Sequence, residues 1–203
     1  MINEADDLLC GLIREAAGDP GVEIVLTAPT PEWAASLGGP AVSVYLYDIR
    51  EDLRRRQHGV LNEYAPSGAV SARHLPPRYV RLSYHLTVWA DEPEVEHGLL
   101  SALLGTLLAC ESPPADRLTG SLADLRLPVT LGVAAPGPDD GTLRATLGGS
   151  FGGVLRPALD VVVTAPLMAA PAIPAAPPVT EPLSLHSGRH GDAGAAATER
   201  RTR

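Results

Sequence analysis

Residues 148–152, Gly-Gly-Ser-Phe-Gly, fit the G-x-S-x-G pattern in which a serine on a tight turn between a strand and a helix acts as a nucleophile. Such a serine also needs a histidine and an acid further along the chain. Residues 152–157 make a poor helix start, and the downstream histidines, His186 and His190, lie in a Pro- and Ala-rich segment. We therefore expect a glycine loop here, and a small serine hydrolase using Ser150 is only a distant alternative.

The six histidines do not have the spacing of a metal site. His85 falls on an expected strand and His97 in the first turns of an expected helix, and neither has a cysteine or a second histidine nearby. We interpret His85 as a half-exposed strand residue and His97 as a solvent-facing residue beside Glu94 and Glu96. No phosphate-binding glycine loop follows a strand either. The sequence thus predicts no metal, no cofactor and no enzymatic activity.

The charged segment from Asp48 to Arg56 is the most informative polar stretch, with acids at 48, 51 and 52 ahead of arginines at 54, 55 and 56. On a helical turn, Glu51–Arg55 and Asp52–Arg56 would be i,i+4 pairs worth about 0.2–0.5 kcal/mol each. One interpretation is a solvent-exposed surface whose acids and arginines pair with each other. The other is a subunit contact, because Arg is enriched at interfaces. Arg78 is either an ion-pair residue at a strand start or a contact residue. The candidate interface residues are Asp48, Arg50, Glu51, Arg54, Arg55, Arg56 and Arg78.

Charge and composition exclude several classes of protein. The net charge is −8, and all sixteen basic residues are arginine. Such an acidic chain does not attract a phosphate backbone over its whole surface, so we expect no nucleic-acid partner. The longest apolar run, Leu99 to Cys110, is too short to cross a bilayer, and the acidic N-terminal segment lacks a signal-peptide pattern. We expect no membrane partner, a cytoplasmic protein, and reduced thiols at Cys10 and Cys110.

Period-two alternation predicts two long half-buried strands, 41–49 and 78–90. Between them we expect a polar loop, with a possible short helix at 52–58. Before them we expect a helix over 4–17 capped by Asn3, a strand over 22–26 and a loop over 27–40. After them we expect a helix begun by an Asp91–Glu94 capping box, and strands at 126–134, 142–147 and 159–165.

This order predicts an α+β fold, with a mainly antiparallel sheet and helices packed on one face. We place the domain at residues 1–165. Residues 166–203 are rich in Pro and Ala and lack aromatic residues, so they are expected to form a disordered tail or arm.

Three stretches resemble the cap, or tube-terminator, family of phage-tail-like extracellular contractile injection systems. They are residues 45–56 (YLYDIRE-x-L-x-x-R), residues 75–90 (LPPRYVRLSYHLTVWA) and residues 94–100 (EVEHGLL), with a weaker match at 156–163. The resemblance implies a tail-terminator-like fold and a structural protein that ends the inner tube and couples it to the last sheath ring. It also implies three partners: the inner-tube protein, the sheath protein and further copies in a six-fold ring.

The resemblance further implies assembly in the cytoplasm into an injection particle that the cell can release. The alternative is an assembly adaptor or chaperone for tube or sheath subunits.

Overall fold

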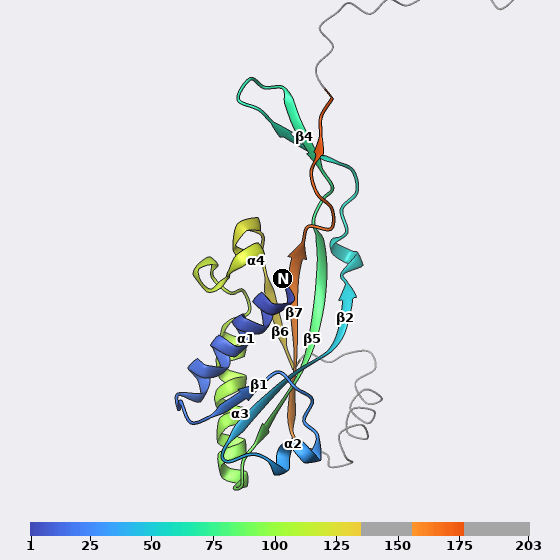
Figure 1. Ribbon diagram of the computed structural model, residues 1–203. Helices are drawn as coiled ribbons and strands as arrows, with labels where there is room; N and C mark the ends of the chain where they lie inside the picture. The colour runs from blue at the N-terminus through green and yellow to red at the C-terminus, as the bar shows by residue number, and fades with distance from the viewer. Residues whose placement is uncertain (135–155, 177–203) are drawn as a thin grey trace, which may run out of the picture.

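The computed structural model describes residues 1–134 and 156–176 (Figure 1). The main body contains a five-stranded sheet in the order β1-β2-β5-β7-β6. Strand β1 runs parallel to β2, and the other neighbouring strands are antiparallel. The predicted α+β fold with a mainly antiparallel sheet is confirmed. The five strands are β1 Glu23–Val25, β2 Ala41–Glu51, β5 Arg78–Trp89, β6 Thr130–Val133 and β7 Ala158–Leu167.

Helices α1 (Ile2–Ala17), α3 (Pro93–Ala109) and α4 (Gly120–Leu125) cover one face of this sheet (Figure 1). Alternate strand residues point toward them and are buried. Val42 and Val44 lie opposite Val88 and Leu86 on β5, as the alternation predicts. The buried core comprises Leu9, Leu12 and Ile13 of α1, Leu103 and Leu107 of α3, Leu122 of α4, and Val42, Val44, Leu82, Tyr84, Leu86, Val88, Val161 and Val163 of the sheet.

A β-bulge at Tyr47 turns the last third of β2 over. Leu46 lies opposite Tyr84 and Asp48 opposite Ser83, so Tyr47 is an extra residue on β2. Beyond the bulge, odd-numbered residues occupy the helix-side face of the sheet, and Arg50 moves to the other face. The spacing of three between Leu46 and Ile49 is the sequence signal for this bulge, because period two would place the next apolar residue at 48.

A second sheet projects beyond the ends of β2, β5 and β7 (Figure 1). It consists of β3 (Leu61–Tyr64), β4 (Val70–His74) and β8 (Ile173–Pro174), all antiparallel, in that order. We call residues 53–77 and 168–176 the arm. The prediction of a polar loop up to Pro77 is therefore wrong. The expected short helix is a single 3-10 turn, η1, at Leu53–Arg55.

Several predicted ends and caps differ from the structure. Asn3 lies inside α1, which begins at Ile2 and ends at Ala17, and its C-cap Gly18 has the left-handed conformation, φ 63°. The residue that caps α3 is Glu92, without a side-chain hydrogen bond, so the expected capping box does not form. Strand β6 starts at Thr130 rather than at 126. Short helices that the sequence did not indicate are α2 (Pro31–Ala35), α4 and the 3-10 turn η2 (Ala115–Arg117).

Strand β7 also extends past its predicted end at residue 165. Pro166 and Leu167 still belong to β7, opposite Tyr79 and Arg78. The chain then continues to β8, which pairs with β4 in the arm. The first residues of the expected tail are therefore part of the fold. The rest of that tail, from residue 177, lies outside the described residues, as do the expected strand 142–147 and Ser150.

Candidate assembly interface

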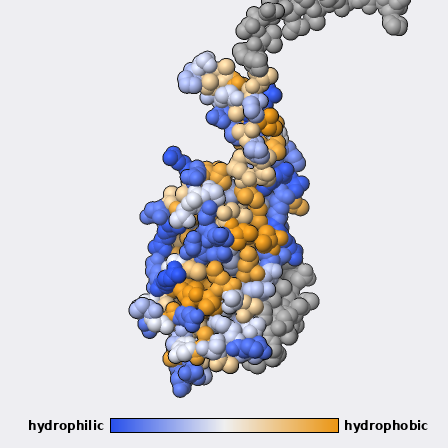
Figure 2. All heavy atoms as spheres, viewed as in Figure 1, coloured by the Kyte–Doolittle hydropathy of each residue, from blue (hydrophilic) through white to orange (hydrophobic). Residues whose placement is uncertain are grey.

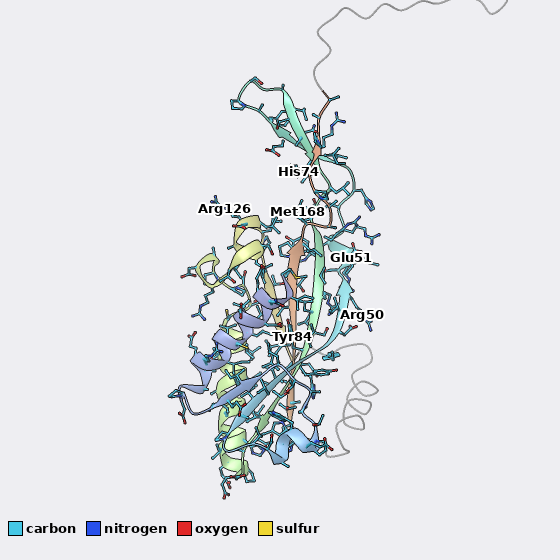
Figure 3. All side chains as sticks on the ribbon, viewed as in Figure 1. Arg50, Glu51, His74, Tyr84, Arg126 and Met168 are labelled. Carbon is cyan, nitrogen blue, oxygen red and sulfur yellow. The ribbon has the colours of Figure 1, made fainter. Side chains whose placement is uncertain are left out.

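Three of the charged residues singled out in the sequence, Glu51, Arg56 and Arg78, meet where the body joins the arm. Figure 3 labels Glu51 at this junction. Its Oε1 accepts hydrogen bonds from Arg56 Nε at 2.9 Å and from Arg78 Nη1 at 3.1 Å, and its Oε2 accepts one from Arg56 Nη2. The hydrogen bond from Arg56 and the charges of both arginines lower the pKa of Glu51. Arg78 therefore forms an ion pair at the start of a strand, which is one of the two roles that the sequence suggests for it.

Asp52 organises the turn that follows. Its Oδ1 accepts a hydrogen bond from the Arg54 backbone N–H at 3.1 Å, and its Oδ2 lies 3.7 Å from Arg55 Nε. Its own N–H donates to the Tyr79 carbonyl at 2.7 Å, and the Arg55 guanidinium lies 5.0 Å from the centre of the Tyr79 ring. The turn is thereby fixed to the start of β5.

The predicted pairs Glu51–Arg55 and Asp52–Arg56 are wrong. The structure forms Glu51–Arg56 and Asp52–Arg55 instead. The reason is local: Glu51 ends a strand and Asp52 has an extended backbone, so the residues do not follow an α-helical spacing.

The remaining candidates point to solvent. Arg50 Nε pairs with Asp48 Oδ2 at 2.7 Å, but the Arg50 side chain is 77 % exposed. Arg54 is exposed and makes no side-chain ion pair within the described residues, and the same holds for Arg73 on β4. The structure thus brings Glu51, Arg56 and Arg78 together and leaves Arg50 and Arg54 outside that group. A role for these residues in subunit contacts stays a prediction.

Sequence reasoning missed the apolar side chains of the arm. Leu53 is 65 % exposed and Tyr64 63 % exposed, and no residue of β3, β4 or β8 is buried. Figure 2 shows hydrophobic and hydrophilic side chains interleaved over the arm. The signal in the sequence is a pair of short runs, 60–64 and 70–75, on either side of Pro66-Ser-Gly68. This is the composition of a hairpin rather than of a polar loop.

An arginine clamp lies at the other end of the sheet. Arg156 Nη1 donates to Oε2 of the buried Glu96 at 2.8 Å, and its guanidinium lies 4.0 Å from the centre of the Trp89 ring. Trp89 in turn packs edge-on against Trp33 of α2, with ring centres 5.6 Å apart. The clamp ties the residues before β7 to β5 and α3.

His85 is not the half-exposed strand residue that the sequence predicts. It is 8 % exposed, and its Nδ1 lies 3.0 Å from Asp160 Oδ1. The pairing of β5 with β7 places these two residues directly opposite each other, a proximity that strand alternation alone does not give. His97 is exposed, as expected. Within the described residues, no three His, Cys, Asp or Glu side chains group to hold a metal ion.

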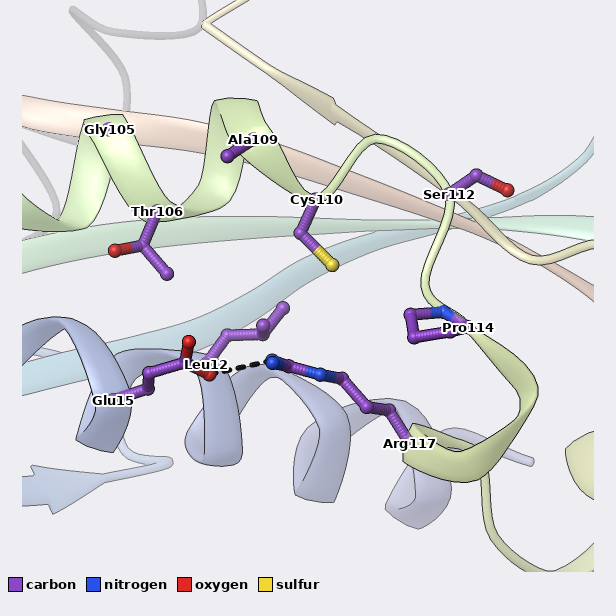
Figure 4. Close-up of a pocket in the computed structure, with 9 residues that line it drawn as sticks. All are labelled: Leu12, Glu15, Gly105, Thr106, Ala109, Cys110, Ser112, Pro114 and Arg117. Atoms are coloured by element: carbon purple, nitrogen blue, oxygen red, sulfur yellow. Dashed lines mark hydrogen bonds and ion pairs between the residues drawn. The ribbon is translucent and has the colours of Figure 1, made fainter.

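A pocket of about 440 Å³ lies between α1, α3 and the segment after α3 (Figure 4). It is lined by Leu12, Glu15, Gly105, Thr106, Ala109, Cys110, Ser112, Pro114 and Arg117. Glu15 Oε2 and Arg117 Nη1 are joined across it at 2.7 Å. Cys10 and Cys110 are free thiols, as expected. No helix in the described part of the chain is long and apolar enough to cross a membrane.

Two solved structures share this fold. One is the sheath/tube terminator of the extracellular contractile injection system PVC, in its extended state, with a TM-score of 0.69 and 21 % identity over 94 % of this chain. The other is the tube-terminating cap of the anti-feeding prophage, with a TM-score of 0.65 and 22 % identity over 89 % of this chain. This chain spans 65 % and 60 % of their lengths. No curated protein matches it.

The resemblance to cap and tube-terminator proteins that the sequence indicates is thus confirmed, together with the tail-terminator-like fold. Residues 4–181 match the family described as the Pvc16 N-terminal domain. The match extends beyond residue 165, in agreement with the continuation of β7 and the addition of β8 to the arm. The chain belongs to the Pvc16 N-terminal domain family.

Proposed function

We propose that this protein is a structural cap that terminates the inner tube of a contractile injection particle and couples it to the last sheath ring. The observation that carries the proposal is the fold, which is shared over 94 % of the chain with a sheath/tube terminator. The family match over residues 4–181 supports it independently.

In the proposed mechanism, six copies form a closed ring. One side of the ring matches the end face of the tube, and the other offers no equivalent face, so that tube growth stops. A closed ring of identical chains needs two different, complementary surfaces on each copy. The exposed Arg54 and Arg73 and the exposed apolar side chains of the arm are suited to one such surface. The role requires binding and shape, and no catalytic group.

The particle is proposed to assemble in the cytoplasm. The test is electron microscopy of particles from a strain that lacks this protein. We expect tubes of uncontrolled length, or particles without a closed end. Particles of normal length with closed ends would contradict the proposal.

The experiment also needs to separate a cap from an assembly adaptor. A tagged full-length chain, detected on finished particles with gold-labelled antibody, is expected at one end of each particle. If particles are abnormal without the protein but carry no label when complete, the protein acts during assembly and is not the cap.

A further inference from the structure

The arm cannot bury its own apolar side chains. Its sheet has three strands, and neither face packs against a helix or against the main sheet, since each of its residues is half-buried or exposed. Small sheets need a covered hydrophobic face to be stable. The exposed apolar side chains of the arm are Leu53, Val60, Leu61, Tyr64, Leu75 and Ile173. Exposed apolar side chains on a projecting element are suited to a contact with another protein.

The charge of the arm indicates the kind of partner. The arm holds four arginines and one glutamate, a net charge of +3, whereas the rest of the chain holds twelve arginines and twenty-three carboxylates, a net charge of −11. Arg55 and Arg56 pair with Asp52 and Glu51 at the base of the arm, so the other two arginines carry its unpaired positive charge. Arg54 and Arg73 are exposed and have no ion pair within the described residues. A surface with acidic groups and some apolar area would complement this arm.

The chain presents such a surface at its opposite end. Strand β5 begins beside the arm and ends at Trp89, twelve residues and roughly 40 Å away. There, α2 packs on the end of β5 through Trp33 and Trp89, and the carboxylates of α2 and of the turn into α3 are exposed, as is Val95. We call this group, Glu32, Asp91, Glu92 and Glu94, the acidic end. None of the four makes an ion pair within the part of the chain that the structure describes.

We propose that the arm of one copy docks on the acidic end of the next copy. The positive and negative surfaces lie at opposite ends of the same molecule, so the contact is head-to-tail and can close into a ring. This inference rests on the proposed ring-forming function and adds to it the two surfaces that meet.

The test is a charge swap in the full-length chain, followed by sedimentation velocity over a range of concentrations. The arm variant carries Arg54→Glu and Arg73→Glu, the end variant carries Glu92→Arg and Glu94→Arg, and the swap variant carries all four changes. The matched control carries Arg14→Glu and Arg126→Glu. It changes the net charge by the same amount as the arm variant, but at exposed residues of the body.

We expect the wild type and the control to self-associate alike. The arm and end variants should each associate about 100-fold more weakly, because like charges then face each other. The swap variant should recover most of that loss, because its charges are again opposite. This recovery also excludes misfolding as the cause of the losses.

Three results would overturn the inference: a wild-type chain that stays monomeric at all concentrations, an arm variant that associates normally, or a swap variant that does not recover. If the arm variant self-associates but no longer sediments with the tube, the arm contacts the tube rather than a second copy. The proposed cap function would then still stand. Conversely, the swap variant could recover while the deletion strain makes normal particles. That result would support this contact between copies and contradict the cap function.

Discussion

The body and the arm differ in where their stability comes from. The five-stranded sheet buries a continuous apolar core under α1, α3 and α4, while no residue of the three-stranded sheet is buried. Both are built from alternating strand sequences of ordinary composition. The body therefore has a packed core of its own, whereas the arm leaves apolar side chains exposed, and for this reason we propose that the arm contacts a second molecule.

The largest expected effect contrasts a leucine of the body with a leucine of the arm. Leu86 is fully buried on β5, and Leu61 is half exposed on β3. We expect Leu86→Ala to lower the free energy of unfolding by about 2–5 kcal/mol because it leaves a cavity. Leu61→Ala should change it by no more than about 0.5 kcal/mol. Urea unfolding of both full-length variants measures this, and equal losses would show that the arm folds as part of the same core.

The Arg156 clamp gives the next effect. Arg156→Met leaves the Glu96 carboxylate buried without its partner, a change that costs about 3–5 kcal/mol in a fully buried pair. The Arg156 side chain is 31 % exposed, so we expect about 1–3 kcal/mol here. The double variant Glu96→Gln and Arg156→Met should recover part of the loss in the same urea experiment. Arg56→Met at the arm junction is the matched comparison, and its loss should be smaller because that pair faces solvent.

Much of the body could be predicted from the sequence, because its signals are local. The alternation over residues 80–88 predicts that the even-numbered side chains enter the core. The structure places these even-numbered side chains on one face of the sheet. The arm could not be predicted, because polar residues surround its short strands and its third strand comes from residues 173–174, a hundred residues away. The ion pairs of Glu51 could not be predicted either, because they depend on a bulge and on the start of β5.

A pH effect is expected in the body, at the contact between α1 and α4. Glu4 accepts hydrogen bonds from the Ser121 hydroxyl at 2.7 Å, from its N–H at 3.0 Å and from the Leu122 N–H at 3.1 Å. Partial burial by itself raises the pKa of Glu4, but these hydrogen bonds, together with the ammonium group of Met1 at 3.3 Å, outweigh it and lower the pKa from 4.5 to about 2. The stabilising effect is therefore complete above about pH 5 and is lost as the pH falls toward 2.

After allowance for screening by solvent, this contact is worth about 1 kcal/mol. Glu4→Gln should lower the melting temperature at pH 7, and the difference between variant and wild type should shrink as the pH is lowered to 3. Melting curves at several pH values measure it. A constant difference across this range would show that the carboxylate charge of Glu4 is not what holds α1 to α4.

The smallest expected effect is on the stability of the arm variant itself. Arg54 and Arg73 are exposed and make no ion pair with described residues of their own chain. Reversing both should change the free energy of unfolding of the dilute monomer by no more than about 0.5 kcal/mol. Urea unfolding at a concentration below that of self-association measures this, with the Arg14→Glu and Arg126→Glu variant as the control. A loss above about 1 kcal/mol in the arm variant alone would mean that these arginines stabilise the fold within one chain. Body and arm would then be a single cooperative unit, and the contrast between a self-sufficient body and an arm kept for a partner would fail.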